Sequence, residues 1–228
     1  MFFSATSTPA LLNRGHFFGI ITILLLLFIL SQSYFLAFHI LAETFSILVA
    51  FSFFTMVWFT VRHHENHYFF FLGTAFLFVG IIDLLHVLSY KGMNVFQGYD
   101  ANLPTQLWIA GRMVQVAALS IAPLFLRRTL QKEKVLVLFA LGTFILCSLV
   151  FMGWFPDCYV EGRGLTLFKV GAEYLFIILL ITAAWQLQYR FRNAFSRDVR
   201  HFLIVAILLT ACQELAFTWY VGVYDISN

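Results

Sequence analysis

Residues 68–90, YFFFLGTAFLFVGIIDLLHVLSY, decide the fold class of this chain. Asp83 and His86 are the only acidic or basic residues in this stretch, which as a helix could cross the roughly 30 Å hydrocarbon core of a bilayer. Similar stretches recur along the chain, and 61% of all residues are hydrophobic whereas 11% are charged. This composition excludes an ordinary soluble domain. We therefore predict an all-α, polytopic transmembrane helical bundle.

Seven spans account for these stretches, in a single transmembrane domain that covers residues 1–228. Basic residues predict their orientation, because short cytoplasmic loops are enriched in lysine and arginine. Ten basic residues precede the first span or follow the second, fourth and sixth, whereas Lys91, Arg163 and Lys169 fall on the opposite side. This pattern places the N-terminus in the cytoplasm. The predicted spans are 17–36, 38–61, 68–90, 105–126, 134–155, 169–189 and 201–224.

Seven spans from a cytoplasmic start would leave residues 224–228 on the outer side. A cytoplasmic output domain could then be reached only through an eighth span. Either the protein acts wholly within the membrane, or the sequence is a segment of a longer protein from which this span and the output domain are missing.

A layer of ionisable residues interrupts the apolar helices. His39 and Glu43 are four residues apart on the second span, and Asp83 and His86 are three apart on the third, so each pair shares a helix face. At ~1.5 Å per residue, most charged groups of the layer fall roughly 6–12 Å below the outer end of their span, with Glu214 deeper. The later spans contribute Trp108, Arg112, Gln115, Glu173, Gln213 and Glu214.

The charges in this layer do not balance. Four carboxylates face Arg112 alone, and such an excess of negative charge cannot persist in a low dielectric. Protonated acids, cationic histidines or a bound cation would resolve it. Because ionisable residues inside a membrane typically mark functional sites, we predict a ligand pocket in the outer half of the bundle. Its predicted residues are His39, Glu43, Asp83, His86, Trp108, Arg112, Glu173 and Glu214.

Each group also has a structural interpretation. Arg112 and Asp83 could form a buried ion pair between the third and fourth spans, and the two histidines could be hydrogen-bonded core residues. Glu173 lies near enough to the interface to be solvated, and Glu214 could be a neutral acid bonded across helices. Cys158 falls in a loop and could be a free thiol.

The cofactor is not specified by the sequence. His39 and His86 could ligate a haem iron or, together with Glu43, a metal ion. Arg112 could clamp a carboxylate or phosphate group. A second group of histidines, in Arg62-His63-His64-Glu65-Asn66-His67, is interpreted as a solvated loop because it has no cysteine partner nearby.

Four groups of residues resemble the signatures of one known family. They are His39-x-x-x-Glu43-x-Phe45-Ser46-Ile47; Leu72-Gly73 and Asp83-Leu84-Leu85-His86 with Tyr90-Lys91-Gly92-Met93; Ala101-Asn102-Leu103-Pro104-Thr105-Gln106-Leu107-Trp108-Ile109-Ala110-x-Arg112; and Phe217-Thr218-x-Tyr220 with Tyr224-Asp225-Ile226-Ser227-Asn228. On these residues the chain resembles the MASE3 membrane-associated sensor domain, and the similarity covers nearly its whole length.

The resemblance implies a multi-pass sensory input module of the bacterial inner membrane. Such modules precede a cytoplasmic diguanylate cyclase, phosphodiesterase or histidine kinase domain in the same chain, and they are not themselves enzymes. In the family pattern another span and the output domain follow residue 228. We also expect a lipid bilayer around the helices, a homodimer of the full-length protein and no nucleic-acid partner.

Two other functions remain as alternatives. A proton-coupled transporter or channel could use the buried acids and histidines as a relay, but the predicted polar groups stop halfway across and no internal repeat is found. A metal-dependent integral membrane enzyme would be expected to have denser histidine spacing. A retinal protein is excluded because the seventh span contains no lysine for a Schiff base.

Overall fold

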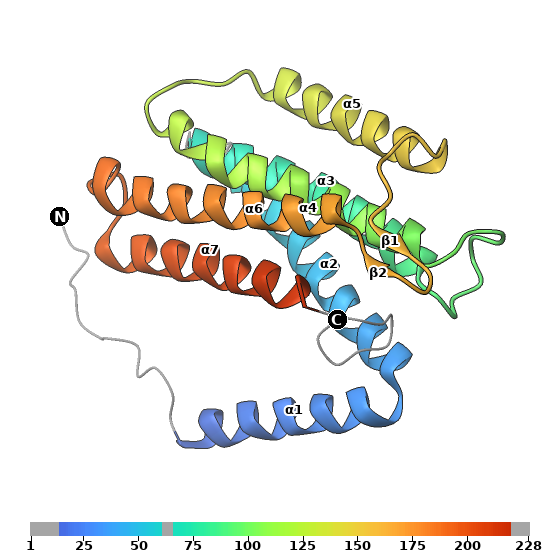
Figure 1. Ribbon diagram of the computed structural model, residues 1–228. Helices are drawn as coiled ribbons and strands as arrows, with labels where there is room; N and C mark the ends of the chain where they lie inside the picture. The colour runs from blue at the N-terminus through green and yellow to red at the C-terminus, as the bar shows by residue number, and fades with distance from the viewer. Residues whose placement is uncertain (1–13, 61–65, 220–228) are drawn as a thin grey trace. The chain divides into compact units, whose positions relative to one another are not determined.

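The computed structural model describes residues 14–60 and 66–219, and its regular structure is helical apart from one short hairpin. The chain divides into two compact units, residues 1–41 and 42–228. The first unit contains α1 (Arg14–Ser33) and the start of α2 (Phe35–Thr60). The second contains the rest of α2 and all later elements (Figure 1). These are α3 (His67–Ser89), α4 (Asn102–Ile121), η1 (Ala122–Leu126), α5 (Lys132–Phe151), β1 (Tyr159–Val160), β2 (Gly164–Leu165), α6 (Leu167–Trp185), η2 (Gln186–Arg190) and α7 (Arg197–Phe217).

Six of the described helices, α2 to α7, are long and apolar enough to cross a membrane. All begin and end close to the predicted spans, except that α7 ends at Phe217, whereas its span was expected to reach residue 224. Residues 220–224 lie outside the described part of the chain. The first predicted span corresponds to α1, whose described apolar stretch, Phe17–Ser33, is shorter. That α1 crosses the membrane therefore stays a prediction.

Local side chains explain several helix ends. The side chain of Asn66 accepts a hydrogen bond from the backbone N–H of Phe69 and so caps α3 (3.2 Å). Thr166 and Ser196 cap α6 and α7 in the same way. At Pro123, which lacks a backbone N–H, the α-helix of α4 gives way to the 3₁₀ turn η1.

The centre of the second unit is the packing of α3 against α4, flanked by α5 and α6, with α7 packed on α6 (Figure 1). Two glycines on α3 allow α2 to approach closely. A Cβ atom at Gly73 would lie 3.0 Å from Cβ of Val57, and one at Gly80 would lie 2.8 Å from Cε1 of Phe51. These glycines therefore fix where α2 and α3 cross.

The hairpin β1–β2 was not expected from the all-α prediction, and it follows a loop held by α4. The side-chain oxygen of Asn102 accepts hydrogen bonds from the backbone N–H groups of Cys158 (2.8 Å) and Tyr159 (3.0 Å). Gln106, one turn later, donates to the carbonyl oxygen of Phe155 at 2.9 Å. Cys158 is a free thiol, as the sequence suggested, but it is fully buried, and burial raises its pKa to about 12.

Candidate functional site

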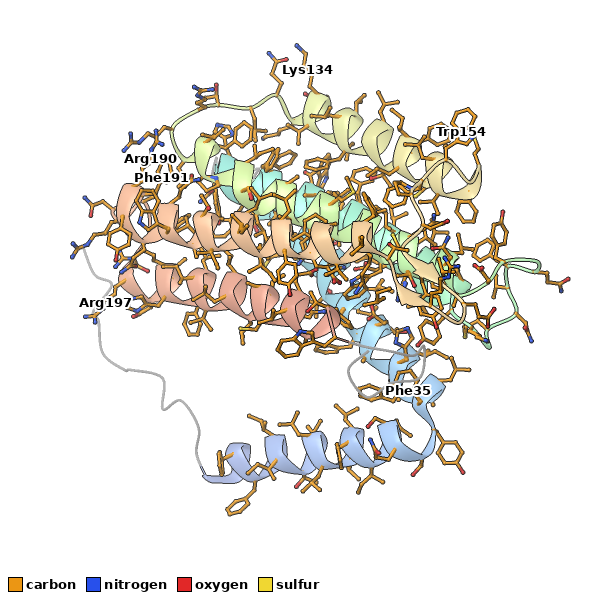
Figure 2. All side chains as sticks on the ribbon, viewed as in Figure 1. Phe35, Lys134, Trp154, Arg190, Phe191 and Arg197 are labelled. Atoms are coloured by element: carbon orange, nitrogen blue, oxygen red, sulfur yellow. The ribbon has the colours of Figure 1, made fainter. Side chains whose placement is uncertain are left out.

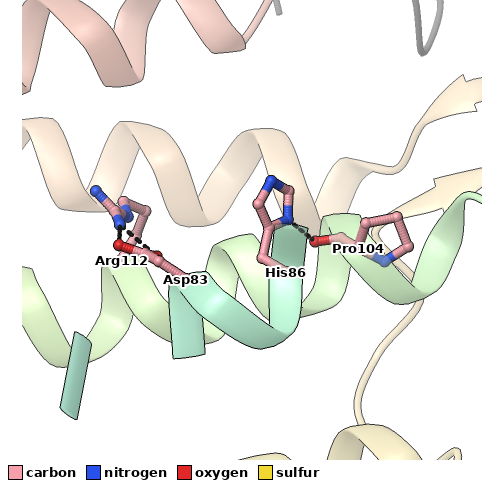
Figure 3. Close-up of polar contacts among 4 residues, drawn as sticks. All are labelled: Asp83, His86, Pro104 and Arg112. Carbon is pink, nitrogen blue, oxygen red and sulfur yellow. Dashed lines mark hydrogen bonds and ion pairs between the residues drawn. The ribbon is translucent and has the colours of Figure 1, made fainter. Parts of the chain in front are cut away.

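A buried ion pair joins the two central helices. One terminal nitrogen of Arg112, Nη2, donates to both carboxylate oxygens of Asp83, at 2.7 and 2.8 Å (Figure 3). Both side chains are buried. A Cβ atom at Gly111 would lie 3.0 Å from Oδ1 of Asp83, so the missing side chain lets α4 come close to the carboxylate. The structure thus contains the pairing that the structural interpretation proposed.

Trp108 lies one turn before Arg112 on α4 and contacts several members of the predicted layer. The guanidinium carbon of Arg112 is 4.4 Å from the centroid of the Trp108 ring, which is a cation–π geometry. The ring centroid of His86 lies 5.5 Å away, and that of Phe217 on α7 lies 4.7 Å away. Trp108 therefore links α3, α4 and α7 at the depth of the ion pair.

His86 is oriented by a backbone hydrogen bond. Its Nδ1 lies 2.8 Å from the carbonyl oxygen of Pro104 (Figure 3). Because a carbonyl oxygen can only accept, Nδ1 donates, and the lone pair of the neutral ring is on Nε2. Histidines that bind metals are typically held in this way. A carboxylate oxygen of Glu43 and a ring nitrogen of His86 lie within 4.8 Å of each other.

A pocket of about 250 Å³ lies beside the ion pair, between α2, α3, α4 and α7. Four residues of the predicted site line it, together with two glutamines and apolar side chains of α2 and α3. Phe45 and Val49 on its rim are exposed on the apolar outer surface of the helices. The lining residues are Glu43, Phe45, Ser46, Val49, Ala50, Phe76, Val79, Asp83, Trp108, Arg112, Gln115 and Gln213.

A second buried ion pair, between Lys169 and Glu173 on α6, corrects the sequence analysis. The Lys169 Nζ lies 2.6 Å from a carboxylate oxygen of Glu173 and donates at 2.5 Å to the backbone carbonyl of Phe217, at the end of α7. Both side chains are fully buried. The sequence analysis counts Lys169 among the basic residues of the outer side and interprets Glu173 as a group near enough to the interface to be solvated. The spacing of four residues between them was the signal that could have revealed the pair.

Glu214 on α7 is fully buried and does not line the pocket. The residue of α7 that lines the pocket is its neighbour Gln213. Glu214 interacts electrostatically with Arg112 and with Lys169. Both of its carboxylate oxygens lack a hydrogen-bond partner among the described residues. The two buried cations therefore share Glu214 as a common neighbour, and the layer contains one more positive charge than the sequence analysis assigned to it.

The predicted site also includes His39, and the sequence analysis singled out a group of loop histidines. His39 lies in the part of α2 that belongs to the first unit, where its ring stacks on that of Phe35, with centroids 6.2 Å apart and an interplanar angle of 15°. His63 and His64 lie outside the described residues. His67 is the first residue of α3.

The model of one protein family, the membrane-associated sensor domain MASE3, matches residues 30–228. The chain belongs to the MASE3 family. The match covers α2 to α7 and every residue of the predicted site, so the pocket and both ion pairs lie within the MASE3 domain. MASE3 domains are sensors, and the function of this segment is accordingly sensory rather than catalytic. Searches of curated proteins and of solved structures found no match.

Proposed function

We propose that this MASE3 domain is the sensory input of a bacterial inner-membrane signalling protein and that it binds a small ligand in the pocket beside Asp83 and Arg112. The observation that carries the proposal is the pocket itself, because it brings Glu43, Asp83 and Arg112 together inside the helical bundle. Its output would be a diguanylate cyclase, phosphodiesterase or histidine kinase domain in the same chain, and the full-length protein would be a homodimer.

The polar atoms of α4 indicate the chemistry of the ligand. Nε1 of Trp108, Nε of Arg112 and Oε1 of Gln115 are buried and have no hydrogen-bond partner among the described residues. Unsatisfied buried groups are costly, and all three residues line the pocket. Two of the atoms are donors, so a ligand with carbonyl or carboxylate oxygens would satisfy them. Asp83 already occupies Nη2 of Arg112, which leaves the rest of the guanidinium for such a ligand.

The pocket can couple binding to helix movement because four helices line it. A ligand shifts an equilibrium between two arrangements only if it binds one of them more tightly. Glu43 on α2 and Gln213 on α7 lie on the pocket wall together with residues of α3 and α4. A ligand that contacts all four helices would therefore favour one arrangement, and the helix ends would transmit the change toward the cytoplasmic output.

The test is to extract the domain from membranes with an amphipathic polymer, without detergent, and to identify the small molecules that co-purify with it by mass spectrometry. The acceptor Oε1 of Gln115, unpaired among the described residues, calls for a donor N–H or O–H on the same ligand, and Glu43 offers that donor a charged acceptor. Replacing Glu43 by glutamine should therefore reduce the content of the bound molecule about tenfold or more, because a hydrogen bond to a charged group is lost. Glu133→Gln makes the same chemical change at an exposed position at the start of α5 and should leave the content unchanged. Equal content in both variants, or no bound molecule in the wild type, would contradict the proposal.

A metal ion or haem is the second candidate, supported by the hydrogen bond from His86 Nδ1 and by the nearby Glu43 carboxylate. His86 and Glu43 would hold the metal, and for haem His86 would ligate the iron. A visible spectrum and elemental analysis of the same preparation test this candidate. We expect His86→Ala to lose the Soret band or the metal, and unchanged content would remove His86 from the ligands.

A further inference from the structure

A group of arginines surrounds the connection between α6 and α7, at the end of the bundle opposite Trp154 (Figure 2). Two adjacent pockets, of about 390 and 470 Å³, lie in this region and share Tyr189 and Arg192. Arg127 and Arg190 line the first pocket. Arg197, Arg200 and His201 line the second. We call these five arginines the basic end.

Two of the three arginines of the first pocket are held by an aromatic ring. Phe191 is buried, and the guanidinium carbons of Arg127 and Arg190 lie 5.4 and 5.8 Å from its centroid. Arg127 follows η1 and Arg190 ends η2, so the ring brings together charges from distant parts of the sequence. Stacking on one ring limits the freedom of both side chains and keeps their positive charges side by side despite their repulsion.

The second pocket contains a buried guanidinium with unused donor capacity. Arg200 is only 9% exposed, and its Nη1 donates to the backbone carbonyl of Arg192. Its Nε has no partner among the described residues. The first turn of α7, capped by Ser196, lies in the same region, and a helix N-terminus adds backbone N–H groups and partial positive charge. Asp198 is exposed and lines neither pocket, and none of the described residues that line the two pockets is a carboxylate.

We infer that the basic end is a binding site for a phosphate group. The donors are guanidinium groups, which match phosphate oxygens in charge and in geometry. The group could belong to the headgroup of an anionic membrane lipid or to free phosphate. The surroundings favour the lipid, because the exposed rings of Trp185 and Tyr189 pack against each other next to the site (5.8 Å between centroids, tilted by 40°), and such rings are typical of the membrane interface. Basic pockets between helix ends commonly hold lipid headgroups.

The test measures binding of three probes to the purified, delipidated domain: dioctanoyl phosphatidylglycerol, dioctanoyl phosphatidylcholine and inorganic phosphate. We expect the anionic lipid to bind more tightly than the zwitterionic one. Arg192→Gln/Arg197→Gln removes two exposed arginines, which spares the buried Arg200 and the fold. Removal of each arginine should weaken binding of the anionic lipid about fivefold, and removal of both should weaken it roughly thirtyfold.

Arg128→Gln/Lys134→Gln is the matched control. It removes the same charge from exposed residues of the same end that line neither pocket (Figure 2 for Lys134). Binding should change less than twofold. If phosphate bound the wild type as tightly as the anionic lipid and lost affinity in the same variant, free phosphate would be the occupant of the inferred site. Equal losses in the two double variants, equal binding of both lipids, or no binding of any probe would overturn the inference.

Discussion

The Asp83–Arg112 pair is the residue-scale feature on which the central helices depend. Replacing Arg112 by alanine should destabilise the domain by about 3–5 kcal/mol, because it leaves a carboxylate buried without its partner. The measurement is unfolding in mixed micelles of mild detergent and sodium dodecyl sulfate.

The matched control for this prediction removes both charges together. Arg112→Met/Asp83→Leu should recover most of the lost stability, because apolar residues of similar size often replace a buried ion pair at little cost. If the Arg112→Ala domain had the same free energy of unfolding as the wild type, a stabilising role for the pair would be contradicted.

Sequence reasoning identified these residues but not all of their partners. Asp83 and Arg112 were paired correctly because charges so deep in predicted spans need a counter-charge. Lys169 was missed because it lies three residues inside the N-terminal end of α6, where a lysine is normally solvated. The choice between Gln213 and Glu214 was beyond the sequence, since neighbouring residues point about 100° apart on a helix and the pattern of α7 does not show which faces the pocket.

At the scale of elements, the approach of α2 to α3 depends on glycine. Gly80→Ala would place Cβ 2.8 Å from Cε1 of Phe51, and the ring would have to move. Overpacking of this kind typically destabilises by about 1–3 kcal/mol.

Gly142 on α5 has no atom within 4 Å of the corresponding position. Gly142→Ala should therefore stabilise its helix by roughly 0.5–1 kcal/mol. Unfolding in detergent measures both, and a Gly80→Ala domain as stable as wild type would show that α2 is not held there.

The loop before the hairpin makes a prediction about thiol reactivity. The thiolate is the reactive form, and burial raises the pKa of Cys158 to about 12, so the folded domain should resist alkylation of this residue at pH 8. Reactivity should appear only as the pH approaches the pKa or when the loop opens. Asn102→Ala removes three hydrogen bonds to this loop, with Asp157, Cys158 and Tyr159, and should expose the thiol. Mass spectrometry after iodoacetamide treatment locates the modification, and rapid alkylation of Cys158 in the wild type would contradict the buried loop.

The helices were predictable and the hairpin was not, for physical reasons. Long apolar stretches between charged loops fix helix ends to within a few residues, as α3 and α5 show. The strands β1 and β2 contain two residues each, too few for an alternating pattern, and the loop that leads to them is held by Asn102 from far along the chain. The π turn η2 likewise leaves no periodic signal, yet it positions Arg190 at the basic end.

At the scale of the whole molecule, arginines gather at one end of the second unit. Arg190 and Arg197 lie at one end of the bundle and Trp154 at the other, as expected if the basic loops share one side of the membrane (Figure 2). The positive-inside rule predicts that the basic end faces the cytoplasm. The lipid site inferred there and the predicted output domain would then lie on the same side. Lipid composition and pocket occupancy could thus act on the same helix ends.

The predicted topology can be tested with single cysteines in a variant that lacks Cys147, Cys158 and Cys212. Seven spans from a cytoplasmic start place residues 34 and 100 outside and residues 15 and 193 inside. A membrane-impermeant maleimide should therefore label Tyr34→Cys and Asp100→Cys in intact cells, and Gly15→Cys and Asn193→Cys only after the membrane is opened.

The two halves of this experiment answer separate questions. Labels at 100 and 193 test the orientation of the second unit, and exchanged accessibility would reverse it. Labels at 15 and 34 test α1 alone, which has a shorter described apolar stretch than the other helices. Opposite sides would show that α1 crosses, because a helix of 20 residues at ~1.5 Å each matches the hydrocarbon core. If residues 15 and 34 were labelled from the same side, the domain would have six spans and the N-terminus would lie on the side of residue 34. Arg14 would then no longer count among the cytoplasmic charges on which the predicted orientation partly rests.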